Sequence, residues 1–191
     1  MHLKNWRVWL GSVLLAGGAA LLAWCGWVWY QAGLAQRHAR ESLNRPPVQA
    51  HVAREHPPAI HRGDVVGELA IPRLHLSVMV LEGADDQILK LAAGHIQGTA
   101  LAPGTGNIGI AAHRDTFFRP LRSIRPEDLI TLKTPSGVSR FQVSDTEVVP
   151  PTDVQVLDRA PGRDLTLVTC YPFHYIGPAP KRFIVHARQV S

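Results

Sequence analysis

The sequence lacks the residue patterns that hold a metal ion, a disulfide framework or a nucleic acid. Its 191 residues include only two cysteines, Cys25 and Cys170. These lie in very different surroundings, and no Cys/His spacing typical of metal sites accompanies them. The net charge of +5 arises within residues 1–63, whereas residues 64–191 carry equal numbers of basic and acidic side chains. We therefore expect no disulfide, no required metal or other cofactor, and no nucleic-acid partner.

Charge is also missing from a long stretch near the N-terminus. Leu10–Trp29 contains no charged residue, and all five tryptophans lie within the first 29 residues, toward the two ends of this stretch. About twenty residues at about 1.5 Å each cross the roughly 30 Å hydrocarbon layer of a membrane, and tryptophan is enriched at its interfaces. We expect a basic cytoplasmic N-terminus over residues 1–9 and an uncleaved transmembrane helix over residues 10–30. A cleaved signal peptide is the alternative.

Residues 31–63 show no lasting apolar periodicity. They contain four prolines, four histidines and scattered basic residues. We expect a short helical continuation to about Ser42 and then an extended tether that joins the anchor to a folded domain. The histidines have no fixed spacing and no Cys or Asp partners, so a solvated linker is favoured over a metal site.

The remaining residues, 64–191, consist of short apolar or alternating runs separated by turns, which is typical of a β-rich domain. Strands are predicted at 65–71, 74–81, 108–113, 129–133, 138–149, 154–157, 165–170 and 183–190. Short helices are predicted at 85–93, where Asp85 and Asp86 mark the start, and at 117–124. About eight strands with only two small helices indicate a mainly β fold, either a closed barrel or a sandwich.

Three polar residues at strand ends form the candidate active site. Cys170 ends the alternating run that begins at Asp164, His113 ends the apolar run 108–113, and Arg182 stands at the start of the last predicted strand. A thiolate is a nucleophile, an imidazole transfers protons, and a guanidinium stays charged and stabilises an oxyanion, so the three suffice for acyl transfer. Considered singly, each has a structural alternative: an inert buried thiol, a satisfied histidine and a surface cation.

Three further residues near this site are weaker candidates. Thr169 precedes Cys170 and is a candidate to hydrogen-bond substrate or the oxyanion, with packing within the strand as the alternative. His186 shares a predicted strand face with Arg182, which would place it along a substrate groove. His174 lies in the Pro/Gly-rich segment after Cys170 and is the alternative general base.

Four segments of residues 64–191 together resemble the sortases, a family of membrane-anchored cysteine transpeptidases. TLVTC at Thr166–Cys170 resembles the family's TLxTC signature, and GHIQGTALAPGTGNIGIAAHR resembles the segment that leads to its catalytic His. GELAIPRLHLSVMVLEG and KRFIVHAR resemble the opening strands and the final strand with the catalytic Arg. The resemblance covers Gly67–Gln189, and the short loop after the Cys is most similar to class D.

The resemblance implies a fold and a reaction. Residues 64–191 would form the closed eight-stranded sortase β-barrel, with Cys170 as nucleophile, His113 as acid/base and Arg182 holding substrate and stabilising the oxyanion. The substrate would be a secreted protein with an LPxTG-like signal near its C-terminus. Cleavage would leave a thioacyl-enzyme, which an amine acceptor such as a cell-wall peptide or a pilin lysine resolves.

The resemblance also implies a location, and it leaves one local difference. The protein would be bacterial and single-pass, with its N-terminus in the cytoplasm and its catalytic domain outside the membrane. Residues 125–128, RPED, replace the Gly-Asp turn expected in this family. The geometry of that turn is therefore open.

Other functions are distinguished by specific features. A membrane-tethered cysteine protease would use the same residues but resolve the acyl-enzyme with water. A non-catalytic β-barrel binding module would keep its function after replacement of Cys170. A wall-crosslinking L,D-transpeptidase is disfavoured because that family places a His-Gly-Cys run before an Arg, whereas here Thr169 precedes Cys170 and His113 lies 57 positions upstream.

Overall fold

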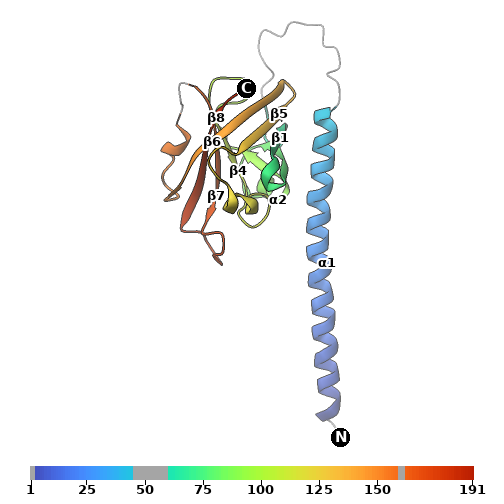
Figure 1. Ribbon diagram of the computed structural model, residues 1–191. Helices are drawn as coiled ribbons and strands as arrows, with labels where there is room; N and C mark the ends of the chain where they lie inside the picture. Colours follow the sequence, from blue (N-terminus) through green and yellow to red (C-terminus); the bar gives the residue numbers. More distant parts are fainter. Residues whose placement is uncertain (1–2, 45–59, 159–161) are drawn as a thin grey trace.

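A computed structural model describes residues 3–44, 60–158 and 162–191, which form one long helix and one barrel (Figure 1). Part of the expected tether, residues 45–59, lies outside the described residues.

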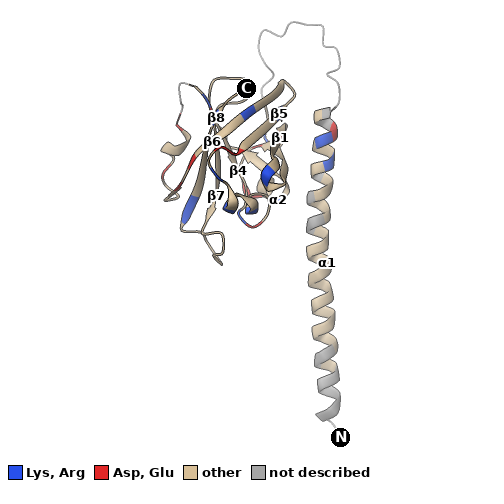
Figure 2. Ribbon diagram, in the orientation of Figure 1, with Lys and Arg blue, Asp and Glu red and all other residues tan. Residues whose placement is uncertain are grey.

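Helix α1 spans Leu3–Asn44 and includes both the predicted membrane segment and the helical continuation. The charged side chains that are described on it lie at its C-terminal end (Figure 2). Large apolar side chains along it are exposed, among them Trp9, Leu14, Leu22 and Trp24. Within the described part of the chain, no helix carries an apolar stretch long enough to cross a membrane. The transmembrane helix expected at residues 10–30 is thus not confirmed.

The C-terminal end of α1 packs against the barrel through two polar side chains. The Gln36 amide Nε2 donates to the carbonyl oxygen of Leu91 at 2.7 Å, and its Oε1 accepts the backbone N–H of Met79 at 2.8 Å. Arg40 forms an ion pair with Glu68 at 2.9 Å. Because Gln36 bonds main-chain groups of two barrel segments at once, it fixes this end of the helix to the domain.

Eight strands form a closed barrel in the order β1-β2-β3-β4-β7-β8-β6-β5 (Figure 1). The strands are β1 Val65–Ile71, β2 Leu76–Glu82, β3 Ala93–His95, β4 Gly106–Ala111, β5 Leu129–Thr134, β6 Gly137–Val149, β7 Arg163–Tyr171 and β8 Lys181–Gln189. The short helices are η1 Pro72–Leu74, α2 Asp86–Leu91, η2 Arg119–Ser123 and η3 Gln155–Leu157. Two pairs, β2/β3 and β4/β7, are parallel, and the other pairs are antiparallel.

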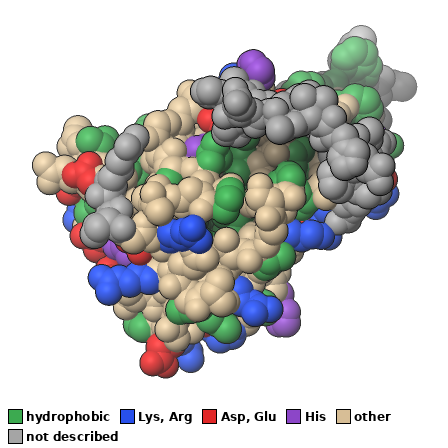
Figure 3. Space-filling view, turned by 90° about the horizontal axis from the view of Figure 1, so that it is seen from above, with side chains coloured by type: hydrophobic (Ala, Val, Ile, Leu, Met, Phe, Trp, Pro, Cys, Tyr) green, Lys and Arg blue, Asp and Glu red, His purple; other side chains and the backbone are tan. Residues whose placement is uncertain are grey.

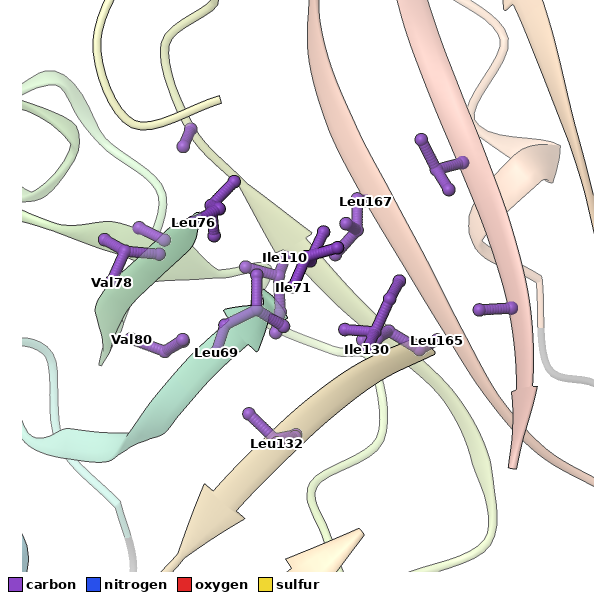
Figure 4. Packing of buried hydrophobic residues seen from close by; sticks show 14 of the residues in the cluster. Leu69, Ile71, Leu76, Val78, Val80, Ile110, Ile130, Leu132, Leu165 and Leu167 are labelled. Carbon is purple, nitrogen blue, oxygen red and sulfur yellow. The ribbon is translucent and has the colours of Figure 1, made fainter. Parts of the chain in front are cut away.

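The barrel interior is filled by apolar side chains that alternate with outward-facing ones along each strand. On the face seen from above, Lys and Arg side chains are spread over the surface (Figure 3). Figure 4 shows the apolar interior side chains meeting from opposite walls, with Leu69 and Ile71 of β1 near Ile110 of β4 and Leu167 of β7. All four have no exposed surface. The predicted mainly β, closed eight-stranded fold is confirmed.

One predicted strand is absent from the structure and one strand was not predicted, although the expected total of about eight strands was right. The predicted strand at 154–157 contains the 3-10 helix η3 instead. Its Leu157 side chain packs on β4, since a Cβ placed on Gly109 would lie 3.1 Å from Leu157 Cδ2. The strand β3 was missed because its three residues, Ala93–His95, are too few to show a period and are all buried.

The RPED turn is held by its last residue. Glu127 has a φ of 71°, and Asp128 accepts the backbone N–H of Arg125 at 2.8 Å while its carboxylate pairs with Arg73. The guanidinium of Arg73 holds the pKa of Asp128 below its ordinary value. An ion pair and a hydrogen bond from the backbone N–H of Arg125 to the Asp128 carboxylate thus take the place of the expected Gly-Asp turn.

Candidate active site

Strands β7 and β8 bring Cys170 and Arg182 together. The two strands are antiparallel, and Cys170 is directly paired with Arg182. Paired residues of antiparallel strands have Cα atoms about 4.5–5.5 Å apart and side chains on the same face. The twelve positions that separate them in sequence are taken up by one residue of β7, the connecting loop and the start of β8.

Strand β4 brings His113 to the same place from the other side of β7. The parallel pairing of β4 with β7 runs as far as Ala111 opposite Val168. Two positions further along both segments, this register reaches His113 and Cys170. The pairing is continued by a bond from the N–H of Ala112 to the Val168 carbonyl at 3.2 Å. The three candidate catalytic residues therefore come from three adjacent segments, with Cys170 in the middle, and all three are half-buried.

The candidate site lies on the outer face of the barrel. Leu165 and Leu167 of β7 belong to the apolar core. Because side chains alternate along a strand, Thr166 and Cys170 point the opposite way. The face that carries the thiol is thus the one not used to build the core.

Thr169 lies on the inner side of β7. Its side chain is only 2% exposed, and its hydroxyl donates to the carbonyl oxygen of Ala112 at 2.8 Å. This bond ties β7 to the segment that leads to His113. The geometry favours the strand-packing alternative for Thr169 over direct contact with substrate.

The β7–β8 loop, residues 172–180, is held at two points by arginine side chains. At its base, Arg182 Nη1 donates to the carbonyl oxygens of Ala179 at 3.3 Å and Lys181 at 3.0 Å. At its tip, Arg114 Nη2 donates to those of Tyr175 at 2.6 Å and Gly177 at 3.1 Å. Arg114 follows His113 directly. The sequence assigns no role to Arg114, because its burial in the structure cannot be read from the sequence.

Aromatic rings close the barrel end beside the site. Phe173 packs on Phe183 edge-on at 5.3 Å between centroids, and Tyr171 stacks on Phe183 at 6.3 Å. Such pairs add stability beyond the area they bury. They fix the first residues of the loop next to Cys170.

His186 lies on the same outer face as Arg182, four residues further along β8. Its Nε2 is 3.0 Å from the carboxylate of Glu147, and its Nδ1 is 3.3 Å from the hydroxyl of Thr166. The Thr166 hydroxyl in turn donates to Asn107 Oδ1 at 2.9 Å. The four side chains form a connected network across β6, β8, β7 and β4.

This network borders an open cavity of about 470 Å³ between the outer face and the segment that contains η3. Besides the network it is lined by several carboxylates, those of Asp145, Asp153, Asp158 and Asp164. Within the described ranges, no three His, Cys, Asp or Glu side chains are grouped closely enough to hold a metal ion. His174, the alternative general base, is exposed on the β7–β8 loop.

Comparison with known proteins identifies the family. The family model described as a sortase domain matches residues 69–190, so the chain belongs to the sortase family of cysteine transpeptidases. It is 31% identical over 130 residues to Sortase D of Bacillus subtilis, an alignment that covers 68% of this chain and 66% of that protein. It is 29% identical over 136 residues to Sortase A of Streptococcus agalactiae, covering 66% of this chain and 53% of that one.

The fold is shared with solved structures of the same family. The structure of a Clostridium perfringens Sortase D5 transpeptidase superimposes with a TM-score of 0.69 at 21% identity, covering 85% of this chain and 99% of that one. The similarity to class D sortases expected from the sequence is confirmed by the match to Sortase D of Bacillus subtilis. The chain spans between half and two thirds of the length of the curated relatives named here.

Proposed function

We propose that this protein is a sortase-type cysteine transpeptidase whose catalytic residues are Cys170, His113 and Arg182. The observation that carries the proposal is the strand register: Cys170 is paired with Arg182 and flanked by the His113 segment on its other side. All three lie at one end of the barrel. No other described cysteine lies in the barrel, because Cys25 belongs to α1.

The acylation step follows from these three groups. The Cys170 thiolate attacks the carbonyl carbon of the scissile peptide, and the negative charge that develops on the carbonyl oxygen faces the Arg182 guanidinium. The C–N bond then breaks, and protonated His113 gives its proton to the departing amine. The product is a thioester between Cys170 and the N-terminal part of the substrate.

The transfer step reverses these roles. An incoming amine attacks the thioester carbon while neutral His113 accepts its proton. The C–S bond breaks, the thiolate of Cys170 is regenerated, and a new amide is released. If water attacks instead, the same residues carry out hydrolysis, which is the protease alternative.

The proposed substrate class follows from family membership. We propose a secreted protein with an LPxTG-like signal near its C-terminus as the donor. The amine acceptor would be a cell-wall peptide or a pilin lysine. The location of the site supports a chain-like substrate, because Cys170, Arg182 and His113 are half-buried and come from three adjacent segments on a face that does not build the core.

We further propose that α1 attaches the catalytic domain to the outer side of a bacterial membrane. The uncharged run at residues 10–29 and the exposed large apolar side chains of α1 support this proposal, since exposed apolar surface marks contact with another molecule or a membrane. Attachment is tested by fractionation: the protein should sediment with membranes and resist extraction by high salt or carbonate. Recovery in the soluble fraction would contradict it.

The reaction is tested with the full-length protein in detergent. Wild type, Cys170→Ala and the matched control Cys25→Ala are incubated with LPxTG-like peptides and hydroxylamine, and the products are identified by mass spectrometry. A hydroxamate at the cleaved carbonyl, formed by wild type and Cys25→Ala but not by Cys170→Ala, is the expected result. Free acid alone at high hydroxylamine would favour the protease, and product formation by Cys170→Ala would contradict the proposal.

A further inference from the structure

Arg114 is a buried cation next to the active site for which the reaction above has no role. It is 9% exposed and lies in the turn that follows His113. Its Nη2 holds two carbonyl oxygens of the β7–β8 loop, and its guanidinium carbon lies 5.9 Å from the centroid of the Tyr175 ring. The contact with the ring adds a cation–π interaction to the two hydrogen bonds.

Stability alone does not explain an arginine at this position. Burying a guanidinium is unfavourable unless its donors are paired. Nη1 of Arg114 is buried and has no hydrogen-bond partner among the described residues. None of the ion pairs seen between described residues includes Arg114. The residue is better explained by the loop that it holds.

The loop that Arg114 holds has few other contacts at its tip. Ile176 is 97% exposed and Tyr175 is 46% exposed, whereas Phe173, near the start of the loop, packs against the core. The base is held by Arg182. Between these anchors, Arg114 supplies the side-chain hydrogen bonds that restrain residues 175–177.

The loop connects the strand that ends near Cys170 with the strand that begins near Arg182, and Arg114 is covalently next to His113. One guanidinium therefore links the segment of the proposed base to the loop between the proposed nucleophile and the proposed oxyanion residue. A fixed loop at this place borders the outer face along which a peptide would lie. A loose loop would have to be ordered each time a peptide binds, which weakens binding.

We propose that Arg114 is a positioning residue: it clamps the β7–β8 loop to the His113 turn and makes the loop a fixed wall of the peptide-binding groove. Its loss raises KM more than it lowers kcat, because Cys170 and Arg182 stay on β7 and β8, and the segment that leads to His113 stays bonded to β7 through the Ala112 N–H and the Thr169 hydroxyl. The kinetic half of this inference rests on the proposed function, whereas the structural half does not.

The experiment compares Arg114→Met, Arg114→Lys and the control Arg119→Met in the full-length protein. Arg119 is an exposed arginine of η2. Hydrogen–deuterium exchange is measured over residues 172–180 and over β7, and KM and kcat are measured with an LPxTG-like peptide and hydroxylamine. In Arg114→Met we expect about tenfold faster exchange in the loop but not in β7, KM raised about fivefold or more, and kcat within about twofold. Arg114→Lys should fall between this variant and wild type, and Arg119→Met should match wild type.

Unchanged loop exchange in Arg114→Met overturns the clamp, and a fall in kcat with KM unchanged overturns its role in binding. If Arg114→Met does not fold, Arg114→Lys carries the test, because a lysine reaches one carbonyl where the arginine reaches two. If wild type turns over no peptide while loop exchange responds to Arg114 as expected, the proposed reaction has failed and the clamp stands. If wild type is active and the Arg114 variants equal Arg119→Met in exchange and in KM, the clamp has failed and the reaction stands.

Discussion

The two faces of strands β7 and β8 differ in their side chains: the inner face packs in the core, and the outer face carries the candidate active site. Where Leu165 and Leu167 are paired with Ala187 and Val185, the inner face is apolar and buried. The outer face of the two strands carries the thiol of Cys170, the guanidinium of Arg182 and the imidazole of His186. Neighbouring residues in a strand point to opposite sides. Within the five residues TLVTC, Leu167 therefore packs in the core, whereas Cys170 lies on the outer face.

Substitutions on the inner face and substitutions on the outer face should therefore affect different properties of the protein. Changes on the inner face should cost stability and leave the chemistry of the folded fraction intact. Changes on the outer face should cost activity and leave the fold intact.

The largest expected effect is that of Cys170→Ala on the outer face. It removes the proposed nucleophile, so turnover should fall by more than about a thousandfold, while the free energy of unfolding changes by less than about 1 kcal/mol because the thiol is only half-buried. Peptide cleavage and urea unfolding measure the two quantities. Residual turnover within tenfold of wild type would show that Cys170 is not the nucleophile.

The inner face is tested by Leu167→Ala, with Val168→Ala as the neighbouring control. Leu167 has no exposed surface, so its truncation should lower the free energy of unfolding by about 2–5 kcal/mol. The Val168 change should cost about 1.5 kcal/mol or less, since Val168 is half-buried on the other face. Equal losses in urea unfolding would show that the two faces are not distinct in packing.

A change that belongs to neither face is Asp128→Asn in the RPED turn. Removing the carboxylate that pairs with Arg73 should cost about 1–3 kcal/mol at neutral pH. Because the pKa of Asp128 is lowered in the folded protein, the ion pair stabilises the fold above the unfolded pKa of about 3.9. This stabilisation is lost as the pH falls through the lowered folded pKa. The difference between wild type and variant, measured by thermal unfolding, should therefore shrink in acid; a difference that grows in acid would contradict the assignment.

The smallest expected effect lies outside the barrel, at the docked end of α1. Gln36→Ala should lower the free energy of unfolding by about 1 kcal/mol and raise hydrogen exchange at the N–H of Met79, which the Gln36 side chain accepts. Turnover should not change, since the described part of α1 packs mainly on β1, β2 and α2, away from the paired residues Cys170 and Arg182 of β7 and β8. A loss of turnover would show that the helix supports the site.

Much of the barrel follows from local patterns. The strands predicted at 165–170 and 183–190 correspond to β7 and β8, and those predicted at 129–133 and 138–149 correspond to β5 and β6. They could be predicted because alternating runs separated by turns are local signals. The strand β3 and the helix η3 were not predictable in this way. Their assignment depends on parallel pairing with β2 and on packing against β4, which are contacts with distant parts of the chain.

The candidate site could not be predicted from local sequence patterns alone. Cys170 and Arg182 sit on adjacent strands, so their pairing follows from a hairpin-like connection. His113 lies 57 positions before Cys170, and only the family resemblance placed them together before the β4/β7 register did. Arg114 was missed because nothing in a sequence distinguishes a buried arginine from an exposed one.

The central claim is that Cys170 carries the acyl group during the reaction. The most direct test is the intact mass of the full-length protein mixed with an LPxTG-like peptide, for wild type, Cys25→Ala, His113→Ala and Cys170→Ala. We predict a covalent adduct with the mass of the peptide fragment up to the cleaved bond in wild type and Cys25→Ala, much less in His113→Ala, and none in Cys170→Ala. An adduct that persists in Cys170→Ala, or that is lost in Cys25→Ala, would contradict the account.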